Sequence, residues 1–322
     1  GARDAAGWRA AALADVARHA RLLDARRRHG CVRRGHGDLH LGNVVLIDGR
    51  PTPFDAIEFN EAIATDDILY DAAFTVMDLM ARAAPPLAGA FLSRYLTATR
   101  DHAALALLPL YVSMRAAVRA FVAWRDDRAA GEARLALATA ALAPRPPARL
   151  IAVGGPSGSG KSTLARALAP EIGAPPGAVM LRSDVARKRL FGVAPEAPLP
   201  AEAYGAAAGA QVYRRLLRDA GRALRAGAPV VLDAAFLRPA ERAAAAALAA
   251  AAGASFAGFW LGASEATMAA RLDARRGDAS DADAAVMRRQ LAALAPPADW
   301  LILDADGPPE AAAAAARAAL RL

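Results

Sequence analysis

The 322-residue sequence is short of several residue types, and each shortage excludes a class of protein. Its single cysteine, Cys31, cannot form an internal disulfide, which fits a reducing, cytoplasmic environment and predicts a buried, inert thiol. No run of about 18 apolar residues is free of charge, so we expect no membrane span. The opening residues GARDAAGWRA contain no apolar signal core, so we expect no export.

Positive charge is abundant, but lysine is nearly absent. The net charge is +8, and lysine occurs only at Lys161 and Lys188, so almost all of the positive charge is arginine. The arginines are spread along predicted helices of an alanine-rich chain, and this compositional bias explains the charge without a polyanionic partner. Aromatic residues make up 6% of the chain and offer few platforms for stacking bases. We therefore expect no nucleic-acid partner.

Clustered prolines divide the chain. The segment APRPPA at 143–148 cannot continue a helix, so we predict two domains, 1–146 and 147–322. In the second domain apolar runs alternate with helical segments. We predict strands at 149–153, 178–181, 229–232, 255–261 and 300–303, and helices at 162–169, 209–226 and 239–252. This alternation is typical of an α/β fold, a parallel sheet with helices on both faces.

The motif GPSGSGKS at 155–162 follows the first of these strands and matches the phosphate-binding pattern G-x-x-x-x-G-K-[ST]. Its glycines let successive N–H groups curl around phosphate oxygens, and the following helix adds the positive end of its dipole. We expect Lys161 to reach the β- and γ-phosphates of ATP and the Ser162 hydroxyl to bind Mg²⁺; a turn that only joins strand to helix is the alternative. The residues expected to bind ATP are Gly155, Ser157, Gly158, Ser159, Gly160, Lys161, Ser162 and Thr163.

Polar residues also follow two other strands, at the edge where substrates of parallel sheets collect. We expect Asp184 to accept the proton of a substrate hydroxyl and Arg187 to hold an anionic group of the substrate. The alternative is that Ser183 or Asp184 caps a helix. Asp233 ends the run PVVLD and is expected to hold a water molecule on Mg²⁺, unless it is an ordinary strand-terminal acid.

Three arginines are candidates for a lid. Arg271, Arg275 and Arg276 lie on a predicted helix that leads into GDASDAD, and their spacings of four and five place them near one helical face. We expect them to close over the phosphates and to stabilise charge on the transferring group. Because arginine is so common in this chain, a solvated helix face remains the alternative.

The segments GGPSGSGKST, RSDVARKRLFG, VVLDAAF and RLDARRGDASDAD, in that order, resemble the small P-loop kinases related to gluconate kinase and zeta toxin. The resemblance covers residues 149–322. It implies a sheet with strand order 2-3-1-4-5, a position for Asp184 near the acceptor hydroxyl, and an arginine lid. The first segment is highly specific, whereas the others are specific only as an ordered set.

The first domain is predicted to be mostly helical, over 8–28 and 66–142, with a β-hairpin centred near Gly49. Its loop HGDLHLGN places Asp38 and Asn43 five residues apart, and the hairpin sets Asn43 opposite Asp55, within one or two residues. A kinase-like site needs a carboxylate at the acceptor hydroxyl, and an amide and a second carboxylate that bind Mg²⁺. We expect Asp38 to act at the hydroxyl, and Asn43 and Asp55 to bind the metal. We expect His40 to pack within the loop rather than to bind a metal.

These segments look like the catalytic loop and metal segment of aminoglycoside phosphotransferases, over about residues 8–142. Kinases of this type need an ATP-clamping loop and a β-strand lysine before the catalytic loop, but only 35 residues precede His36 and none is lysine. We favour a fragment whose missing N-lobe is supplied by a longer parent chain; a domain that has lost its activity is the alternative. The tandem resembles a bacterial family described as bifunctional aminoglycoside phosphotransferase and ATP-binding proteins.

The leading hypothesis for function is an ATP-dependent phosphotransferase that acts on a hydroxyl of a small-molecule phosphate acceptor, with its chemistry in residues 149–322. Lys161 and the lid arginines would neutralise developing charge, and Asp184 would activate the hydroxyl. A non-catalytic, ATP-responsive switch and a nucleic-acid 5′-hydroxyl kinase are the alternatives. Residues 185–228 carry no motif that identifies the acceptor.

Overall fold

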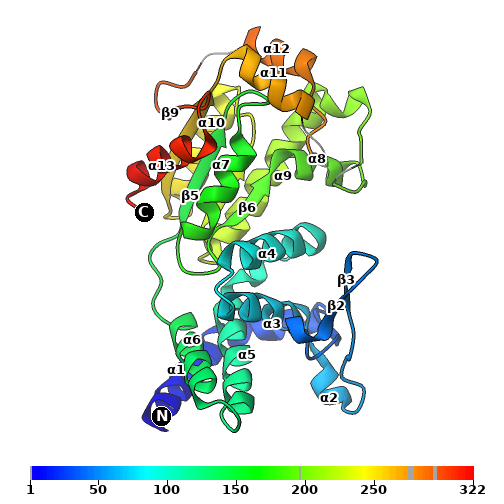
Figure 1. Ribbon diagram of the computed structural model, residues 1–322, viewed down its shortest axis with the longest axis vertical. Coiled ribbons are helices and arrows are strands. Elements are labelled where there is room, and N and C mark those ends of the chain that lie inside the picture. The colour runs from blue at the N-terminus through cyan, green and yellow to red at the C-terminus, as the bar shows by residue number, and fades with distance from the viewer. Residues whose placement is uncertain (1, 196, 275–278, 293–295) are drawn as a thin grey trace. The chain divides into compact units, whose positions relative to one another are not determined.

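The computed structural model describes residues 2–195, 197–274, 279–292 and 296–322 (Figure 1). The chain divides into two compact units. The first unit comprises residues 1–95 and 104–145, and the second comprises residues 96–103 and 146–322. The last passage between the units, from Arg145 to Pro146, lies within the proline cluster that the sequence marks as a linker, whereas residues 96–103 of the predicted first domain belong to the second unit.

Helices dominate the first 142 residues. They are α1 (Ala2–Arg28), α2 (Glu61–Ala64), α3 (Ile68–Ala81), α4 (Pro85–Thr99), α5 (Leu108–Ala123) and α6 (Arg128–Ala141), with 3₁₀ turns η1 (Leu41–Asn43) and η2 (His102–Leu107). Strands β1 (Val32–Arg34) and β4 (Thr65–Asp67) form one antiparallel pair, and β2 (Val44–Ile47) and β3 (Arg50–Pro53) form another. Pro85 and Pro109 lie in the first turns of α4 and α5, where a missing N–H costs nothing, so these prolines begin helices.

The β2–β3 hairpin forms where the Asp48-Gly49 pair predicts it. Both turn residues have positive φ, +50° and +73°, as a two-residue hairpin turn requires. Ile47 pairs with Arg50 and Val44 with Pro53, and the Phe54 amide donates to the Asn43 carbonyl at 3.0 Å. Phe54 therefore lies opposite Asn43. The predicted partner, Asp55, is one residue further along, within the stated range.

The core of the first unit is built on helix α5, which packs against α3 on one side and α6 on another. The end of α1 is fixed to the start of α3 by a buried ion pair in which Arg26 Nε and Nη2 lie 2.6 and 2.7 Å from the Asp67 carboxylate oxygens. One helical stretch of the described chain, His102–Ala123, has the length and apolar composition of a membrane span, and 56% of its apolar window is buried inside the fold. That degree of burial is typical of a core helix.

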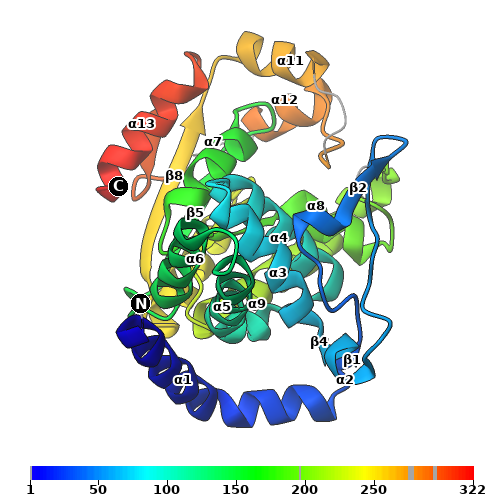
Figure 2. The ribbon, with the colours of Figure 1, turned by 60° about the horizontal axis from the view of Figure 1, so that its bottom comes forward.

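The second unit contains a parallel five-stranded sheet. Its strands are β5 (Arg149–Gly154), β6 (Val179–Arg182), β7 (Val230–Asp233), β8 (Ser255–Gly262) and β9 (Leu301–Asp304). Their spatial order is β6-β7-β5-β8-β9, which is the predicted order 2-3-1-4-5. Figure 2 shows the long strand β8 running beside β5. The helices are α7 (Lys161–Leu168), α8 (Ser183–Leu190), α9 (Ala206–Arg225), α10 (Pro239–Ala251), α11 (Glu265–Ala274), α12 (Ala284–Ala292) and α13 (Pro309–Leu320), with 3₁₀ turns η3 (Ala169–Glu171) and η4 (Ala201–Tyr204).

Both faces of this sheet are covered, as the apolar pattern predicts. Ile151 and Val153 of the central strand join one core cluster with residues of α7 and α13, the two helices seen in front of the sheet in Figure 1. Alternate residues of a strand point to opposite faces, and Leu150 and Ala152 are also fully buried. The α/β fold with flanking helices is therefore confirmed, and the carboxyl ends of β5, β6 and β7 lie together at one edge.

Candidate functional site

The loop between β5 and α7 has the backbone of a phosphate cradle. Gly155, Gly158 and Gly160 have φ values of +136°, +83° and +96°. A Cβ on Gly155 would lie 2.5 Å from the Leu261 carbonyl oxygen, and one on Gly158 would lie 2.6 Å from the Met268 carbonyl oxygen. The loop therefore needs glycine for two reasons. Its backbone is left-handed, and it lies too close to β8 and α11 to leave room for a Cβ.

The inner side of this loop offers hydrogen-bond donors. Helix α7 begins at Lys161, so the first N–H groups of the helix have no intrahelical partner and point, with the helix dipole, toward the loop. The Ser159 hydroxyl is buried without a hydrogen-bond partner among the described residues. Lys161 lies across the loop, where its Nζ donates to the Pro156 carbonyl at 2.6 Å. This set of donors fits the phosphates of a nucleotide.

The strand-end carboxylate Asp233 meets the helix-start hydroxyl Ser162. Ser162 Oγ donates to Asp233 Oδ2 at 2.5 Å, and Asp233 is only 4% exposed. A hydroxyl and a carboxylate are the hard oxygen ligands that Mg²⁺ prefers, so these residues fit that ion. The described part of the chain has no group of three or more His, Cys, Asp or Glu side chains that could hold a metal. A magnesium ion here would therefore complete its coordination with phosphate oxygens and water.

Arg182, which the sequence reasoning missed, completes this cluster. Its Nε donates to Asp233 Oδ2 at 3.0 Å and its Nη2 donates to Ser162 Oγ at 3.1 Å. Arg182 and Asp233 are register partners at the ends of the neighbouring strands β6 and β7. The strand-terminal position of Arg182, two residues before Asp184, was the signal that could have identified it.

The turn after β7 is held in a strained conformation. Phe236 has φ +50°, unusual for a bulky residue, and is fully buried. Its N–H donates to the Tyr213 hydroxyl at 2.8 Å, and its carbonyl accepts from Arg242 Nη1 at 2.8 Å. The preceding carbonyl, of Ala235, accepts from the Gly155 amide at 3.1 Å. These contacts fix Asp233 relative to the phosphate loop.

Asp184 lies in the first turn of α8, near the same edge of the sheet. The N-cap of α8 is Arg182, so neither Ser183 nor Asp184 occupies that position. Within the described part of the chain, the Arg182 side chain makes no capping hydrogen bond. Burial and the nearby Asp233 carboxylate raise the pKa of Asp184, against the opposing effects of Arg182, Lys161 and a hydrogen bond from Ser280. A raised pKa suits a carboxylate that must accept a proton.

Arg187 lies one turn further along α8 and faces the same space. Its Nη1 donates to the Ala203 carbonyl at 2.6 Å, and its guanidinium carbon lies 4.9 Å from the centre of the Tyr204 ring. Its Nε is buried without a hydrogen-bond partner among the described residues. The side chain is thus held in place and retains a donor for a further ligand.

The second lysine of the chain, Lys188, is 1% exposed and pairs with Asp281. Asp281 Oδ2 also accepts from the Tyr204 hydroxyl at 2.6 Å and from the Leu199 amide at 3.1 Å. Burial would raise the pKa of Asp281, but the hydrogen bonds from these three groups hold it below the usual value. The cluster ties segment 197–204 to segment 279–283, next to the Ser280 that contacts Asp184.

Replacing Lys188 with methionine should loosen these two segments. The change leaves the Asp281 carboxylate without its cation, which should cost about 2 kcal/mol because Asp281 is partly exposed. Hydrogen–deuterium exchange should show the Leu199 amide exchanging about thirtyfold faster, while amides of β5 are unchanged. The double variant Lys188→Met/Asp281→Asn, which removes both charges but keeps an acceptor oxygen for the Leu199 amide, should recover part of the protection. Unchanged exchange at Leu199 in the single variant would show that the pair does not hold the segments.

The predicted lid arginines can be followed in part. Arg271, on α11, donates to the Ala305 carbonyl at 2.8 Å, and its Nη1 lies 3.8 Å from the position of a Cβ on Gly160. It therefore lies against the phosphate loop. Arg275 and Arg276 lie outside the described residues. Helix α12 contributes Gln290, which the sequence reasoning missed and whose side-chain oxygen accepts from the Ser157 amide at 2.7 Å.

One cavity of about 520 Å³ connects these groups. The phosphate loop lines one part of it through Lys161 and Ser162, and Asp184 and Arg187 line another. Further lining residues are Thr163, Arg166, Ser183, Tyr204, Tyr213, Asp233, Arg271, Ser280 and Gln290. The second unit therefore has a single space that can hold both a triphosphate end and a second molecule.

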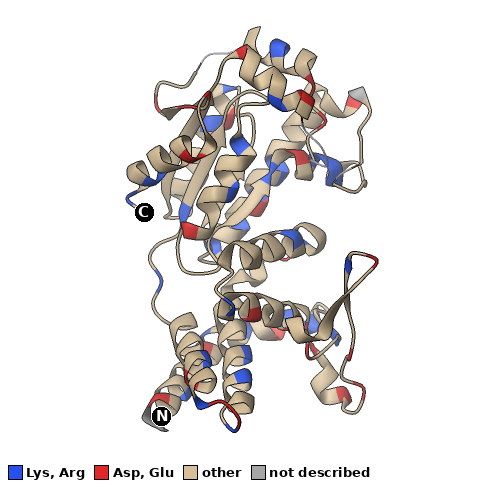
Figure 3. Ribbon diagram, viewed as in Figure 1, with Lys and Arg blue, Asp and Glu red and all other residues tan. Residues whose placement is uncertain are grey.

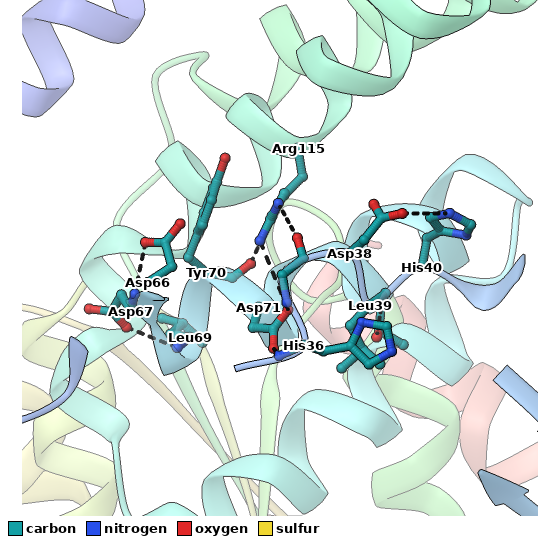
Figure 4. A network of polar contacts seen from close by, with 12 residues as sticks. His36, Asp38, Leu39, His40, Asp66, Asp67, Leu69, Tyr70, Asp71 and Arg115 are labelled. Carbon is teal, nitrogen blue, oxygen red and sulfur yellow. Dashed lines mark hydrogen bonds and ion pairs between the residues drawn. The ribbon is translucent and has the colours of Figure 1, made fainter. Parts of the chain in front are cut away.

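In the first unit, helix α3 holds the loop 36–43 in place (Figure 4). The carboxylate of Asp71 accepts from the amides of His36 at 2.7 Å and Gly37 at 3.1 Å. One and two turns later, Thr75 donates to the Leu39 carbonyl at 2.8 Å and Asp78 accepts from the Leu41 amide at 3.0 Å. Residues at this spacing share one helix face, so α3 fixes the loop at successive points.

Arg115 of α5 adds a buried cation beneath the same loop. It donates to the Gly37 carbonyl at 3.0 Å and to the Tyr70 carbonyl at 3.2 Å. Its guanidinium carbon lies 3.7 Å from the centre of the Tyr70 ring and 4.6 Å from that of Phe74. Figure 4 shows Arg115 beside Asp71 and the backbone of the loop. The loop is therefore held by hydrogen bonds with both α3 and α5.

Asp38 and Asn43 meet within this loop, and Asp55 follows Phe54, the residue opposite Asn43. Asn43 Nδ2 donates to the Asp38 carbonyl at 3.0 Å and to Asp38 Oδ2 at 3.2 Å. His40 Nδ1 accepts from the Gly42 amide at 3.0 Å, so His40 packs within the loop as expected. Asp55 is exposed, has φ +60°, and in the described structure has no hydrogen bond to Asp38 or Asn43.

Charged residues are dispersed over the elements of each unit. Figure 3 shows arginine and lysine distributed along the helices, with acidic residues interspersed among them. Many of the arginines are paired within the fold, as in the contacts of Arg317 with Glu171 and of Arg288 with Glu265. Part of the positive charge of this chain, whose net charge is +8, is therefore paired with carboxylates inside the fold.

Residues 150–297 match the model of a protein family described as an AAA domain. The match includes the phosphate loop, both candidate carboxylates and helices α7 to α12. The second unit is therefore similar to this family over its phosphate loop and most of its sheet.

Two curated relatives are an uncharacterized protein of Mycobacterium tuberculosis and one of Mycobacterium bovis. Each is 36% identical to this chain over 290 residues, which is 87% of this chain and 57% of the relative. The chain thus spans little more than half the length of these relatives.

Similar solved structures include an unliganded sugar kinase from Janibacter sp., with 23% identity and a TM-score of 0.40, covering 54% of this chain and 95% of that one. A gluconokinase from Sinorhizobium meliloti has 24% identity and a TM-score of 0.38, covering 55% and 94%. The Mycobacterium tuberculosis APS kinase in complex with AMPPNP and APS has 20% identity and a TM-score of 0.39, covering 55% and 99%.

Proposed function

We propose that the second unit is an ATP-dependent phosphotransferase that transfers the γ-phosphoryl group of ATP to a hydroxyl of a small molecule. The observation that supports this most strongly is the shared cavity, in which the phosphate loop lies on one side and Asp184 and Arg187 on the other. A nucleotide-binding site without an acceptor would not need a carboxylate of raised pKa in the same space.

In the proposed reaction the acceptor oxygen forms a bond to the γ-phosphorus while the bond to the β–γ bridging oxygen breaks, releasing ADP. Asp184 takes the proton of the acceptor hydroxyl, and Arg187 holds an anionic group of the acceptor. Lys161 and Arg271, with the loop amides, stabilise negative charge on the phosphates. Ser162 directly and Asp233 through water would hold Mg²⁺, which would supply positive charge to the phosphates. Arg275 keeps its predicted role in the lid as part of this proposal.

Transfer of label from γ-labelled ATP would test this function. We would incubate the protein with Mg²⁺, labelled ATP and separate pools of sugars, sugar acids, nucleosides and an oligonucleotide with a free 5′-hydroxyl. The proposal predicts label in one small-molecule pool, because a cavity of about 520 Å³ suits a small acceptor. Label only in the oligonucleotide would favour a nucleic-acid kinase. Nucleotide binding without transfer to any pool would favour a regulatory switch.

We also propose that the first unit is the C-lobe of an aminoglycoside-phosphotransferase-like domain whose ATP-binding lobe belongs to a longer parent chain. The support is local. Asp38 and Asn43 meet in a loop that α3 and Arg115 hold in place, as a pre-organised phosphoryl-transfer site requires. Asp55, which is exposed and follows the residue opposite Asn43, keeps its proposed role as a metal ligand.

A further inference from the structure

Arg182 occupies the two groups to which we assign Mg²⁺. Its guanidinium donates to Asp233 Oδ2 at 3.0 Å and to Ser162 Oγ at 3.1 Å. The Arg182 and Asp233 side chains are 12% and 5% exposed, so water screens this ion pair poorly. Because Arg182 and Asp233 are register partners on adjacent strands, the sheet itself sets their approach.

A buried carboxylate needs a counter-charge, and here two carboxylates share the region. The Asp233 carboxylate raises the pKa of Asp184 and Arg182 lowers it, which places the guanidinium within the electrostatic reach of both acids. Removing one partner of a buried ion pair leaves the other without compensation. Arg182 is therefore, together with Lys161, a positive charge that stabilises these acids at the carboxyl edge of the sheet.

A divalent cation at Ser162 would face this arginine at close range. One lone pair of Ser162 Oγ already accepts the N–H of Arg182, and its proton is donated to Asp233. Two cations a few ångströms apart in a poorly hydrated cavity repel each other strongly. Arg182 must therefore move away from these oxygens when Mg²⁺ binds, or its repulsion must lower the affinity of the site for Mg²⁺.

We infer that Arg182 is the resident counter-cation of the magnesium position and sets the Mg²⁺ concentration at which the protein–nucleotide complex takes up the metal. The inference rests on the proposed function, because it assumes that the phosphate loop binds a nucleotide. Arg182 is then a positioning residue for Asp233, and it competes with the metal for Ser162. In the absence of Mg²⁺, Arg182 partly replaces the missing positive charge near the phosphates.

The test uses ADP as the probe and the full chain as the protein. Calorimetry would give the Kd for ADP in EDTA and over a range of Mg²⁺ concentrations, for the wild type and for Arg182→Gln. We expect the half-saturating Mg²⁺ concentration to fall about tenfold in the variant, because the opposing charge is gone. In EDTA the variant should bind ADP about threefold more weakly, because the resident cation is absent.

Three further variants keep the result interpretable. Arg182→Lys retains the charge, so its half-saturating Mg²⁺ should stay closer to that of the wild type than that of Arg182→Gln. Arg182→Met, which also removes the charge, replaces the glutamine variant if that variant fails to fold. Arg218→Gln removes an arginine of α9 whose side chain is 54% exposed and does not line the cavity, and it should leave the Mg²⁺ dependence unchanged.

A higher or unchanged half-saturating Mg²⁺ in Arg182→Gln would overturn the inference, because Arg182 would then assist the metal or be irrelevant to it. Failure of the wild type to bind ADP under any condition would instead reject the proposed function. The two failures are therefore distinguishable.

Discussion

Lys161→Ala should reduce ATP-dependent turnover by about a thousandfold or more. The side chain lies across the phosphate loop and lines the cavity, where its ammonium group can contact the β- and γ-phosphates. Alanine removes this charge from the transition state and cannot recruit another lysine, because the remaining one, Lys188, is buried in its pair with Asp281. Initial rates of ADP formation with saturating acceptor would measure the loss.

The matched control for this variant is Arg218→Ala on α9, whose side chain is 54% exposed. It removes a positive charge away from the cavity, so turnover should stay within about twofold. Unchanged ATP consumption in Lys161→Ala would contradict the mechanism in the second unit. Residual turnover that is lost on adding Asp38→Asn would assign that activity to the first unit.

Asp184→Asn should abolish phosphoryl transfer while leaving the affinity for ATP within about threefold. Asparagine has nearly the same shape as aspartate but cannot accept the acceptor's proton. Nucleotide binding should survive because the loop donors, Lys161 and Ser162 lie outside the changed group. Calorimetry with ATP, together with transfer rates, would separate the two effects. Transfer at the wild-type rate would show that Asp184 only helps to build the start of α8.

The pH dependence offers a second test of Asp184. Burial and the Asp233 carboxylate raise its pKa, so the base becomes protonated at a higher pH than an ordinary aspartate. Transfer should therefore fall as the pH decreases through this raised pKa and should recover above it. In Asp184→Asn the residual rate should lack this acidic limb. A wild-type acidic limb that persists in the variant would point to another group.

The phosphate loop and the sheet could be predicted because their signals are local. A contiguous motif fixes both the left-handed glycines and the start of α7, and runs of apolar residues alternating with helices locate the five parallel strands. The strand order came from the resemblance to small P-loop kinases, and the structure has the same order. The turn at Asp48-Gly49 set the hairpin to within one residue.

Contacts between distant segments could not be read from local patterns. Arg182 and Asp233 are 51 positions apart, and Lys188 and Asp281 are 93 apart, so only the folded sheet and helices bring them together. Arg115 was hidden for the same reason, since it contacts Gly37 across 78 positions. In a chain so rich in arginine, composition cannot distinguish such buried side chains from those on solvated surfaces.

The account depends on one physical property, the ability of residues 155–163 to hold a triphosphate. Calorimetric titration of the wild-type chain with ATP and Mg²⁺ tests it most directly, with Lys161→Ala titrated in parallel. We predict saturable binding of one nucleotide to the second unit, and its loss in the variant. Absence of binding to the wild type, or equal binding to both proteins, would contradict the account.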